Sequence, residues 1–288
     1  MTGAAGFIAD VALRQAGLPP LRGLHAVGGG DVAAAYRVES GTRQVFLKVG
    51  VAAVALAAEA LALEEIAATR TLRVPSVLAC GEAEGSGYLL LEWIDLSRSG
   101  DWDAAGRQLA ALHGHTAARH GWRRDNIIGA SPQSNSISAV WSEFFRERRL
   151  RPQFALARAH GLAPVAALEA RACRASDALL VGHAPAPSLL HGDLWRGNFA
   201  FDCRGRPVVF DPATYYGDAE TDLAMTRLFG GFAGSFYDAY AATRRPAAGE
   251  HERLPLYQLY HVLNHANLFG GGYAAQAIAL IERLAAGD

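Results

Sequence analysis

Lysine is almost absent from the sequence. Of the 27 Lys and Arg residues, only Lys48 is a lysine, and the others are arginine. Arginine does the same work as lysine on a solvated surface, so a lysine that remains marks a position that a planar guanidinium cannot fill. Lys48 also lies in the apolar, strand-like run Val45–Val49, where an idle ammonium would be costly. We therefore expect a specific role for Lys48; the alternative is chance survival at a surface position.

Cysteine is scarce, and long apolar runs are absent. The three cysteines are odd in number and widely spaced, which fits neither a disulfide framework nor a zinc site. No apolar segment is long enough to span a bilayer, and the first residues lack the basic and apolar regions of a signal peptide. We therefore expect a reducing, cytoplasmic location.

Neither sign of charge dominates. The 27 basic residues face 28 acidic ones, which gives a net charge of -1 and a pI of about 6.8. This balance does not favour nucleic acid or a membrane surface as a partner. Hydrophobic residues make up 51% of the 288-residue chain, a globular composition that suggests two domains or one two-lobed domain. The oligomeric state is left open.

Apolar periodicity divides the chain into a β-rich first third and a helical remainder. In the first third it predicts two helices and five strands, at residues 7–16, 52–69, 24–28, 34–40, 45–49, 77–80 and 88–93. Beyond residue 100 it predicts helices at 101–120, 138–150, 162–181, 220–229, 254–269 and 274–285, with a short strand pair at 198–202 and 207–211. We expect an α+β fold with two lobes, a small antiparallel-sheet lobe over residues 1–94 and a mainly helical lobe over residues 95–288.

The segment His191–Asn198 carries the strongest chemical signal. It reads His, one residue, Asp, four residues, Asn, which is the spacing of a kinase catalytic loop. Phosphoryl transfer needs a carboxylate that orients the attacking hydroxyl and accepts its proton, and Asp193 fits that role. It also needs an oxygen ligand for magnesium, and Asn198 fits that one. The alternative is an ordinary turn, with Asp193 as its cap and His191 packed against it.

Three further features accompany this loop in chain order, and their agreement favours the catalytic interpretation. Asp211 follows a strand and a turn, where a kinase carries its second metal-binding aspartate. Lys48 would contact ATP phosphates, with Glu59 on the next helix as its partner and Glu64 and Glu65 as competitors.

The third feature is the glycine run Gly28, Gly29 and Gly30 before the Lys48 strand. It predicts a flexible backbone cover over ATP phosphates, with an ordinary hairpin turn as the alternative. Backbone groups near Glu92 and Ile94 could bind the adenine edge, although a plain buried strand gives the same pattern.

These residues resemble the fructosamine kinase family, also called ketosamine 3-kinases. The resemblance covers almost the whole chain and rests on the stretches Gly28–Asp31, Gly121–Gly129, His191–Asn198, Phe210–Ala213 and Phe229–Phe232. It implies a protein-kinase-like fold related to aminoglycoside and choline kinases, with ATP and Mg²⁺ as cofactors. The implied activity is phosphorylation of the sugar 3-hydroxyl of ribulosamines, erythrulosamines or fructosamines, free or protein-bound. The unstable 3-phosphate then eliminates and frees the amine, which is deglycation.

The sugar is expected near Trp195, with Asn126 and Tyr216 as further pocket residues. Two alternatives stay open. One is another small-molecule kinase on this fold, for an aminoglycoside or an amino alcohol, which would need an acidic wall for its cationic substrate. The other is a catalytically inactive nucleotide-binding scaffold, which the intact set of Lys48 and Asp193 with its two metal-ligand candidates disfavours.

Overall fold

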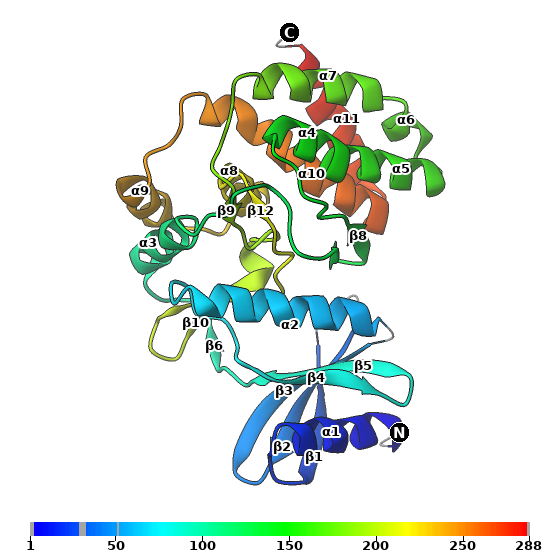
Figure 1. Cartoon of the computed structure of the whole chain (residues 1–288), viewed down its shortest axis with the longest axis vertical. Coiled ribbons are helices and arrows are strands. Elements are labelled where there is room, and N and C mark those ends of the chain that lie inside the picture. The colour runs from blue at the N-terminus through cyan, green and yellow to red at the C-terminus, as the bar shows by residue number, and fades with distance from the viewer. Residues whose placement is uncertain (1–2, 29–32, 51, 287–288) are drawn as a thin grey trace. The chain divides into compact units, whose positions relative to one another are not determined.

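The computed structural model describes residues 3–28, 33–50 and 52–286 (Figure 1). Contacts divide the chain into two compact units. The first unit contains the chain up to Asp101 together with the later segment Phe199–Pro212, and the second contains Trp102–Asn198 and the chain from Ala213 onward. The return of a later segment to the first unit was not among the expectations from the sequence.

The first unit is built on a five-stranded antiparallel sheet, as the sequence predicted. The strand order is β1-β2-β3-β5-β4. Neighbouring strands are therefore consecutive in the sequence, except for the pair β3 and β5. The strands are β1 (Leu21–Val27), β2 (Ala34–Ser40), β3 (Arg43–Gly50), β4 (Val77–Ala83) and β5 (Ser86–Glu92).

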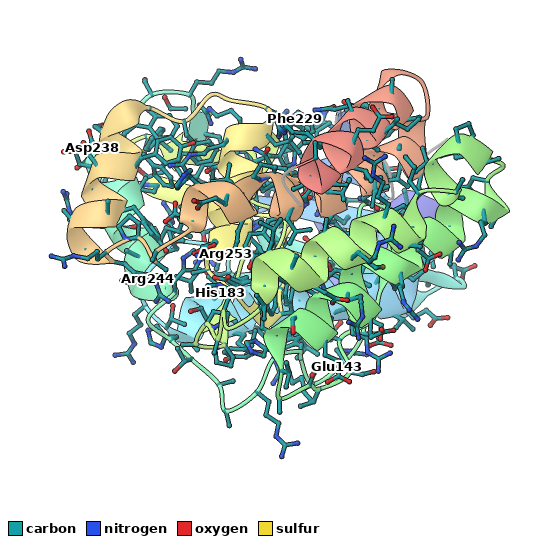
Figure 2. All side chains as sticks on the ribbon, turned by 90° about the horizontal axis from the view of Figure 1, so that it is seen from above. Glu143, His183, Phe229, Asp238, Arg244 and Arg253 are labelled. Atoms are coloured by element: carbon teal, nitrogen blue, oxygen red, sulfur yellow. The ribbon has the colours of Figure 1, made fainter. Side chains whose placement is uncertain are left out.

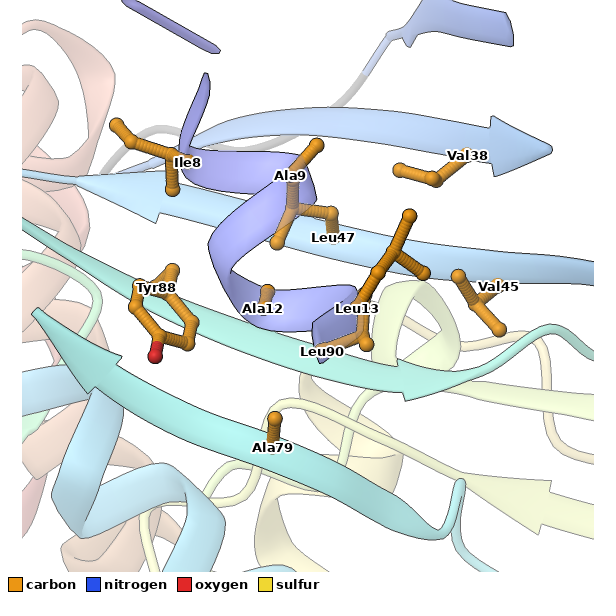
Figure 3. Close-up of a cluster of buried hydrophobic side chains, with 10 residues drawn as sticks. All are labelled: Ile8, Ala9, Ala12, Leu13, Val38, Val45, Leu47, Ala79, Tyr88 and Leu90. Carbon is orange, nitrogen blue, oxygen red and sulfur yellow. The ribbon is translucent and has the colours of Figure 1, made fainter. Parts of the chain in front are cut away.

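Strand β3 contacts a different helix on each of its two faces. Its buried Leu47 joins Leu13 and other side chains of α1 (Gly3–Gln15) in an apolar cluster (Figure 3). Successive strand residues point to opposite faces, so Lys48 faces away from α1 and toward α2 (Ala53–Ala68), where it meets Glu59. This alternation lets one strand supply both a core residue and a charged residue.

The later segment of the first unit forms a hairpin. Its elements are β10 (Phe199–Asp202), β11 (Pro207–Val209) and the short strand β6 (Leu96–Ser97), in the order β11-β10-β6. Arg73 donates to Asp202 at 2.5 Å and to Glu92 at 2.6 Å, and its carbonyl accepts from Val209. The hairpin that leads to Asp211 is thereby tied to the end of β5.

The second unit is mainly helical. Its helices are α3 (Trp102–Leu112), α4 (Trp141–Phe145), a π-helical turn (Arg146–Leu150), α5 (Arg151–Ala159), α6 (Ala163–Ala166), α7 (Glu169–Leu180), α8 (Glu220–Leu228), α9 (Gly234–Thr243), α10 (Glu250–Phe269) and α11 (Gly272–Ala285). Two small strand pairs accompany them, β7 (Asn126–Ile128) with β8 (Ser131–Gln133), and β9 (Ser188–Leu189) with β12 (Tyr216–Gly217). Among the described helices, none combines the length and the apolar character needed to cross a membrane.

Candidate active site

The only lysine of the chain lies between two carboxylates in the first unit. Its Nζ atom is 2.7 Å from Oε1 of Glu59 and 2.5 Å from Oδ1 of Asp211. The three residues come from strand β3, helix α2 and the turn that follows β11. The structure thus pairs Lys48 with Glu59, the expected partner, and adds Asp211 as a second one.

Burial and charge oppose each other in this cluster. Burial by itself would lower the pKa of Lys48, but the carboxylates of Glu59 and Asp211 outweigh it and hold that pKa above its usual value. Burial also raises the pKa of Glu59, an effect that Lys48 partly offsets. The Asp211 side chain is 47% exposed against 15% for Glu59, so Asp211 is the accessible carboxylate of the pair.

Asp211 has an unusual backbone. Its φ of 57° lies in the left-handed region, which residues other than glycine rarely occupy. The chain turns sharply at this residue, directly before Pro212. The turn brings the Asp211 carboxylate back toward Lys48, and such outliers are common where a side chain must be aimed at a functional position.

The structure describes only some of the nucleotide-binding residues predicted around the sheet. Gly28 is exposed just after β1, whereas Gly29 and Gly30 lie outside the described residues. The carboxylate of Glu92 accepts from Arg73. The backbone N–H of Glu92 donates to the backbone carbonyl of the residue directly before β4. The backbone near Ile94, two residues beyond β5, remains the predicted position for an adenine contact.

The catalytic loop of the second unit joins the two residues that the motif spacing singled out. The amide Nδ2 of Asn198 donates to both the carbonyl and the Oδ2 atom of Asp193, each at 3.0 Å. The backbone N–H of Asn198 donates to the carbonyl of Trp195, which closes a short 3-10 turn. The Asp193 carboxylate is therefore oriented by its own loop, and Oδ1 of Asn198 stays a predicted oxygen ligand for a cation.

Two glycines are required by the shape of this loop. Gly192 has a φ of 85°, and a Cβ atom there would lie 2.1 Å from the carbonyl oxygen of Ala213. A Cβ atom at Gly197 would lie 2.3 Å from the indole ring of Trp195. The first glycine lets the loop turn before Asp193, and the second lets the Trp195 ring fold back onto the loop.

A buried aspartate clamps the loop by accepting hydrogen bonds from the loop backbone. Asp222 on α8 accepts from the backbone N–H of His191 at 2.8 Å and of Gly192 at 2.9 Å. Burial alone would raise the pKa of Asp222, but hydrogen bonds from His113 and the loop hold it below its usual value. Asp222 therefore braces the backbone of the loop directly before Asp193.

His113 extends this clamp. It is fully buried, its Nε2 atom lies 3.2 Å from Asp222, and its Nδ1 atom lies 2.8 Å from the hydroxyl of Tyr240 on α9. His113 and Tyr240 are 127 positions apart in the chain, so only the fold brings them together. The chain Tyr240–His113–Asp222 connects α9 and α3 to the backbone of the catalytic loop.

Asn126, expected in the sugar pocket, is engaged elsewhere. It is buried, its Nδ2 atom donates to the carbonyl of Thr214, and its Oδ1 atom accepts from Gln133 and Asn135, both at 2.8 Å. This use of its donor and acceptor atoms favours a supporting role beneath the segment that leads to Tyr216. A sugar contact by Asn126 stays a prediction, which these engaged donor and acceptor atoms disfavour. Tyr216 lies in β12, partly buried, where its backbone pairs with Gly121.

One group of metal-capable side chains was not expected from the sequence. His183, Asp218 and Glu220 lie close enough together to share a cation. However, Asp218 accepts from His183 at 2.6 Å, and both oxygens of Glu220 accept from Arg253 at 2.6 and 2.8 Å. The two donor residues, His183 and Arg253, are labelled in Figure 2. The guanidinium of Arg253 already pairs with Glu220, and Asp218 is engaged by His183, so the cluster acts as a buried hydrogen-bonded network.

Comparisons with known proteins identify the family of the chain. The family model described as fructosamine kinase matches residues 8–286. A probable ketoamine kinase from Synechocystis sp. is 45% identical over 264 residues, covering 90% of this chain and 88% of the relative. A chloroplastic protein-ribulosamine 3-kinase from Arabidopsis thaliana is 40% identical over 271 residues, covering 89% and 81%.

A solved structure matches over nearly the full length. The "Putative fructosamine-3-kinase" of Haemophilus somnus 129PT superimposes with a TM-score of 0.89 at 27% identity and covers 98% of both chains. The α+β, protein-kinase-like fold expected from the sequence is confirmed. The chain belongs to the fructosamine kinase family and is a phosphotransferase.

Proposed function

We propose that the protein is an ATP-dependent ketosamine 3-kinase that acts on ribulosamines, erythrulosamines or fructosamines. The observation that carries this proposal is the oriented Asp193 carboxylate, held by Asn198 on a loop that Asp222 clamps. Membership of the fructosamine kinase family, with relatives named ketoamine kinase and protein-ribulosamine 3-kinase, supports the substrate class.

In the proposed reaction, Asp193 orients the 3-hydroxyl of the sugar and accepts its proton. The bond from O3 to the γ-phosphorus of ATP forms, the bond from that phosphorus to the β,γ-bridging oxygen breaks, and ADP leaves. The residues contribute position and charge rather than covalent chemistry. The 3-phosphate product then loses inorganic phosphate by β-elimination. Water hydrolyses the remaining enamine to a 3-deoxy dicarbonyl sugar and the free amine.

Lys48 is the proposed phosphate contact, with Glu59 keeping it in place. For the metal, Asn198 offers Oδ1 and Asp211 offers a half-exposed carboxylate, and such hard oxygen donors fit Mg²⁺. Asn198 directly precedes β10 and Asp211 closely follows β11, so the two proposed ligands flank one hairpin in the chain. A bound Mg²⁺ would neutralise charge on the triphosphate.

We also propose a cytosolic location, the compartment expected from cysteine usage. None of the three described cysteines, Cys80, Cys173 and Cys203, forms a disulfide bond, which suits a reducing environment.

An ATP-consumption assay tests the activity. The panel contains ribulose-lysine, erythrulose-lysine and fructose-lysine, with an aminoglycoside and choline as comparators, all with Mg²⁺. We expect turnover with at least one ketosamine and none in the Asp193→Asn variant. Turnover with an aminoglycoside or choline and with no ketosamine would overturn the substrate class. Tight ATP binding without turnover on any acceptor would indicate an inactive scaffold.

A further inference from the structure

Five ring side chains form a continuous group in the second unit, here called the aromatic patch. Trp195 meets Phe229 at 5.8 Å between ring centroids, and Phe229 meets His265 at 4.9 Å. His265 in turn lies 5.6 Å from Phe269 and 5.1 Å from Tyr273. The rings come from the catalytic loop, the end of α8 (Figure 2), the end of α10 and the start of α11.

Part of the aromatic patch is accessible. Phe229 is 37% exposed and Phe269 is 55% exposed, although large aromatic side chains are normally well buried. The glycine turns beside these two rings leave open space, because a Cβ atom at Gly230, Gly270 or Gly271 would meet nothing within 4 Å. A ligand could therefore reach the ring faces.

The aromatic patch suits a cation. Nδ1 of His265 donates to the carbonyl of His261 at 2.8 Å, so Nε2 of the neutral ring is an acceptor. Burial lowers the pKa of His265, which keeps this ring uncharged at neutral pH. The guanidinium of Arg196 lies over the ring of Trp102 at 5.4 Å, so this neighbouring cation already has an aromatic partner outside the patch.

The aromatic patch is also continuous with the catalytic loop. Trp195 follows Asp193 by two residues, and its ring is held against Gly197. In a ketosamine, the 3-hydroxyl is separated from the amine by only two further carbons. A substrate whose hydroxyl reaches Asp193 must therefore place its amine and the attached stem close to Trp195.

We propose that the aromatic patch is the subsite for the amine half of a ketosamine, where the rings contact the secondary ammonium and its aliphatic stem. Aromatic faces attract ammonium groups, and their apolar area covers a hydrocarbon chain such as that of lysine. This proposal rests on the proposed function and sharpens it. It assigns to the site ketosamines of aliphatic amines, whether the amine is a peptide lysine or a free alkylamine, rather than polycationic amino sugars.

The first experiment compares two substrates in steady-state kinetics. One is the ribulosamine of a blocked lysine and the other is 1-amino-1-deoxyribulose, which has no stem. For Phe269→Ala and Phe229→Ala we expect kcat/KM on the lysine substrate to fall roughly 3- to 30-fold through KM, with a smaller loss on the short substrate. Phe7→Ala is the matched control, since Phe7 is 48% exposed on α1 of the first unit. Equal losses on both substrates, or none, would overturn the proposal.

The second experiment isolates the charge. It compares N-butyl-ribulosamine with the neutral 1-O-butyl-ribulose ether in the wild type and in Phe269→Leu, which keeps apolar bulk and should fold normally. We expect the wild type to prefer the amine and Phe269→Leu to lose part of that preference, by roughly 2- to 10-fold. An unchanged preference would contradict an ammonium contact at this ring. A parallel arm with a ribulosyl-lysine peptide separates protein-bound from free amines as the better substrate.

These outcomes distinguish the two proposals. If the wild type phosphorylates no ketosamine, the proposed function is wrong and the subsite fails with it. If the wild type is active but the patch variants treat long and short substrates alike, only the subsite is wrong.

Discussion

The two proposed halves of the catalytic apparatus are held together in different ways. In the first unit, Lys48 and Asp211 are 163 positions apart in the chain and are joined by an ion pair. In the second unit, Asp193 and Asn198 are five positions apart, and hydrogen bonds to the loop backbone fix their shape. The first arrangement depends on the chemical identity of one cation, and the second depends on backbone geometry. A substitution that keeps the charge of Lys48 should therefore still damage the first arrangement, and a substitution that loosens the loop backbone should damage the second.

The largest effect is expected at Asp193. Asp193→Asn keeps the shape of the side chain but removes the proton acceptor, so kcat should fall about 10²- to 10⁴-fold. ATP affinity, measured by calorimetry, should stay close to that of the wild type. Asp238→Asn on the exposed surface of α9 (Figure 2) is the matched control and should be fully active. Full turnover by Asp193→Asn would remove Asp193 from the mechanism.

Lys48→Arg tests the other side of the comparison. The guanidinium is larger and planar, so it cannot place a single nitrogen within hydrogen-bond distance of both Glu59 and Asp211. Misplacing a phosphate contact by about 1 Å can cost around 100-fold, and we expect kcat/KM for ATP to fall about 10- to 100-fold. Arg43→Lys, at the exposed start of the same strand, makes the reverse exchange and should change little. Normal activity of Lys48→Arg would show that the single lysine is there by chance.

A smaller effect is expected from the support beneath the catalytic loop. His113→Phe removes the contacts to Asp222 and Tyr240 while keeping a ring in the same place. Losing hydrogen bonds of this kind costs about 1–3 kcal/mol, and loosening the loop should lower kcat about tenfold with KM for ATP unchanged. Tyr240→Phe, which removes only the outer hydroxyl, should retain most of the activity. A fall in stability without any change in kcat would mean that His113 does not position the loop.

The smallest effect on the reaction is expected at His120, because this residue affects the pH dependence of stability and not catalysis. Burial lowers the pKa of His120 from 6.5 to about 4, against the opposing charge of Asp218. The unfolded chain therefore takes up a proton near pH 6.5 while the folded chain does not until about pH 4. Stability is full above pH 6.5 and declines as the pH falls toward 4, by about 3 kcal/mol. Urea unfolding at pH 7.5 and pH 4.5 should show a flatter dependence for His120→Phe. An identical pH dependence in both proteins would exclude His120 as the cause.

Site residues could be predicted from the sequence where composition or the spacing within a short motif singles them out. Lys48 stands out by composition, and Asp193 and Asn198 by spacing, because a loop of fixed length brings them together. His113 and Tyr240 are not singled out in this way, since 127 positions separate them and only the fold joins them. Asn126 shows the converse limit. Asn126 lies in a stretch that resembles the family, which indicates that this position matters. A sequence does not distinguish a polar residue that faces a substrate from one that is buried in a hydrogen-bond network.

The fold shows the same division between local and tertiary causes. The strands of the first unit follow from period-two alternation and were predicted. The helix expected over 101–120 ends at Leu112, because Thr116, His120 and Gly121 form isolated bridges with other segments instead. Helix α5 was not predicted. It contains Pro152, and proline is compatible with the first turn of a helix.

The position of the transferred phosphate tests the central claim most directly. Ribulosyl-lysine is incubated with ATP and Mg²⁺, and the product is mapped by proton–phosphorus correlation NMR before it decomposes. We predict phosphate on O3 with the wild type and with Asp238→Asn, and no product with Asp193→Asn. Phosphate on a different oxygen, or wild-type rates with Asp193→Asn, would contradict the account.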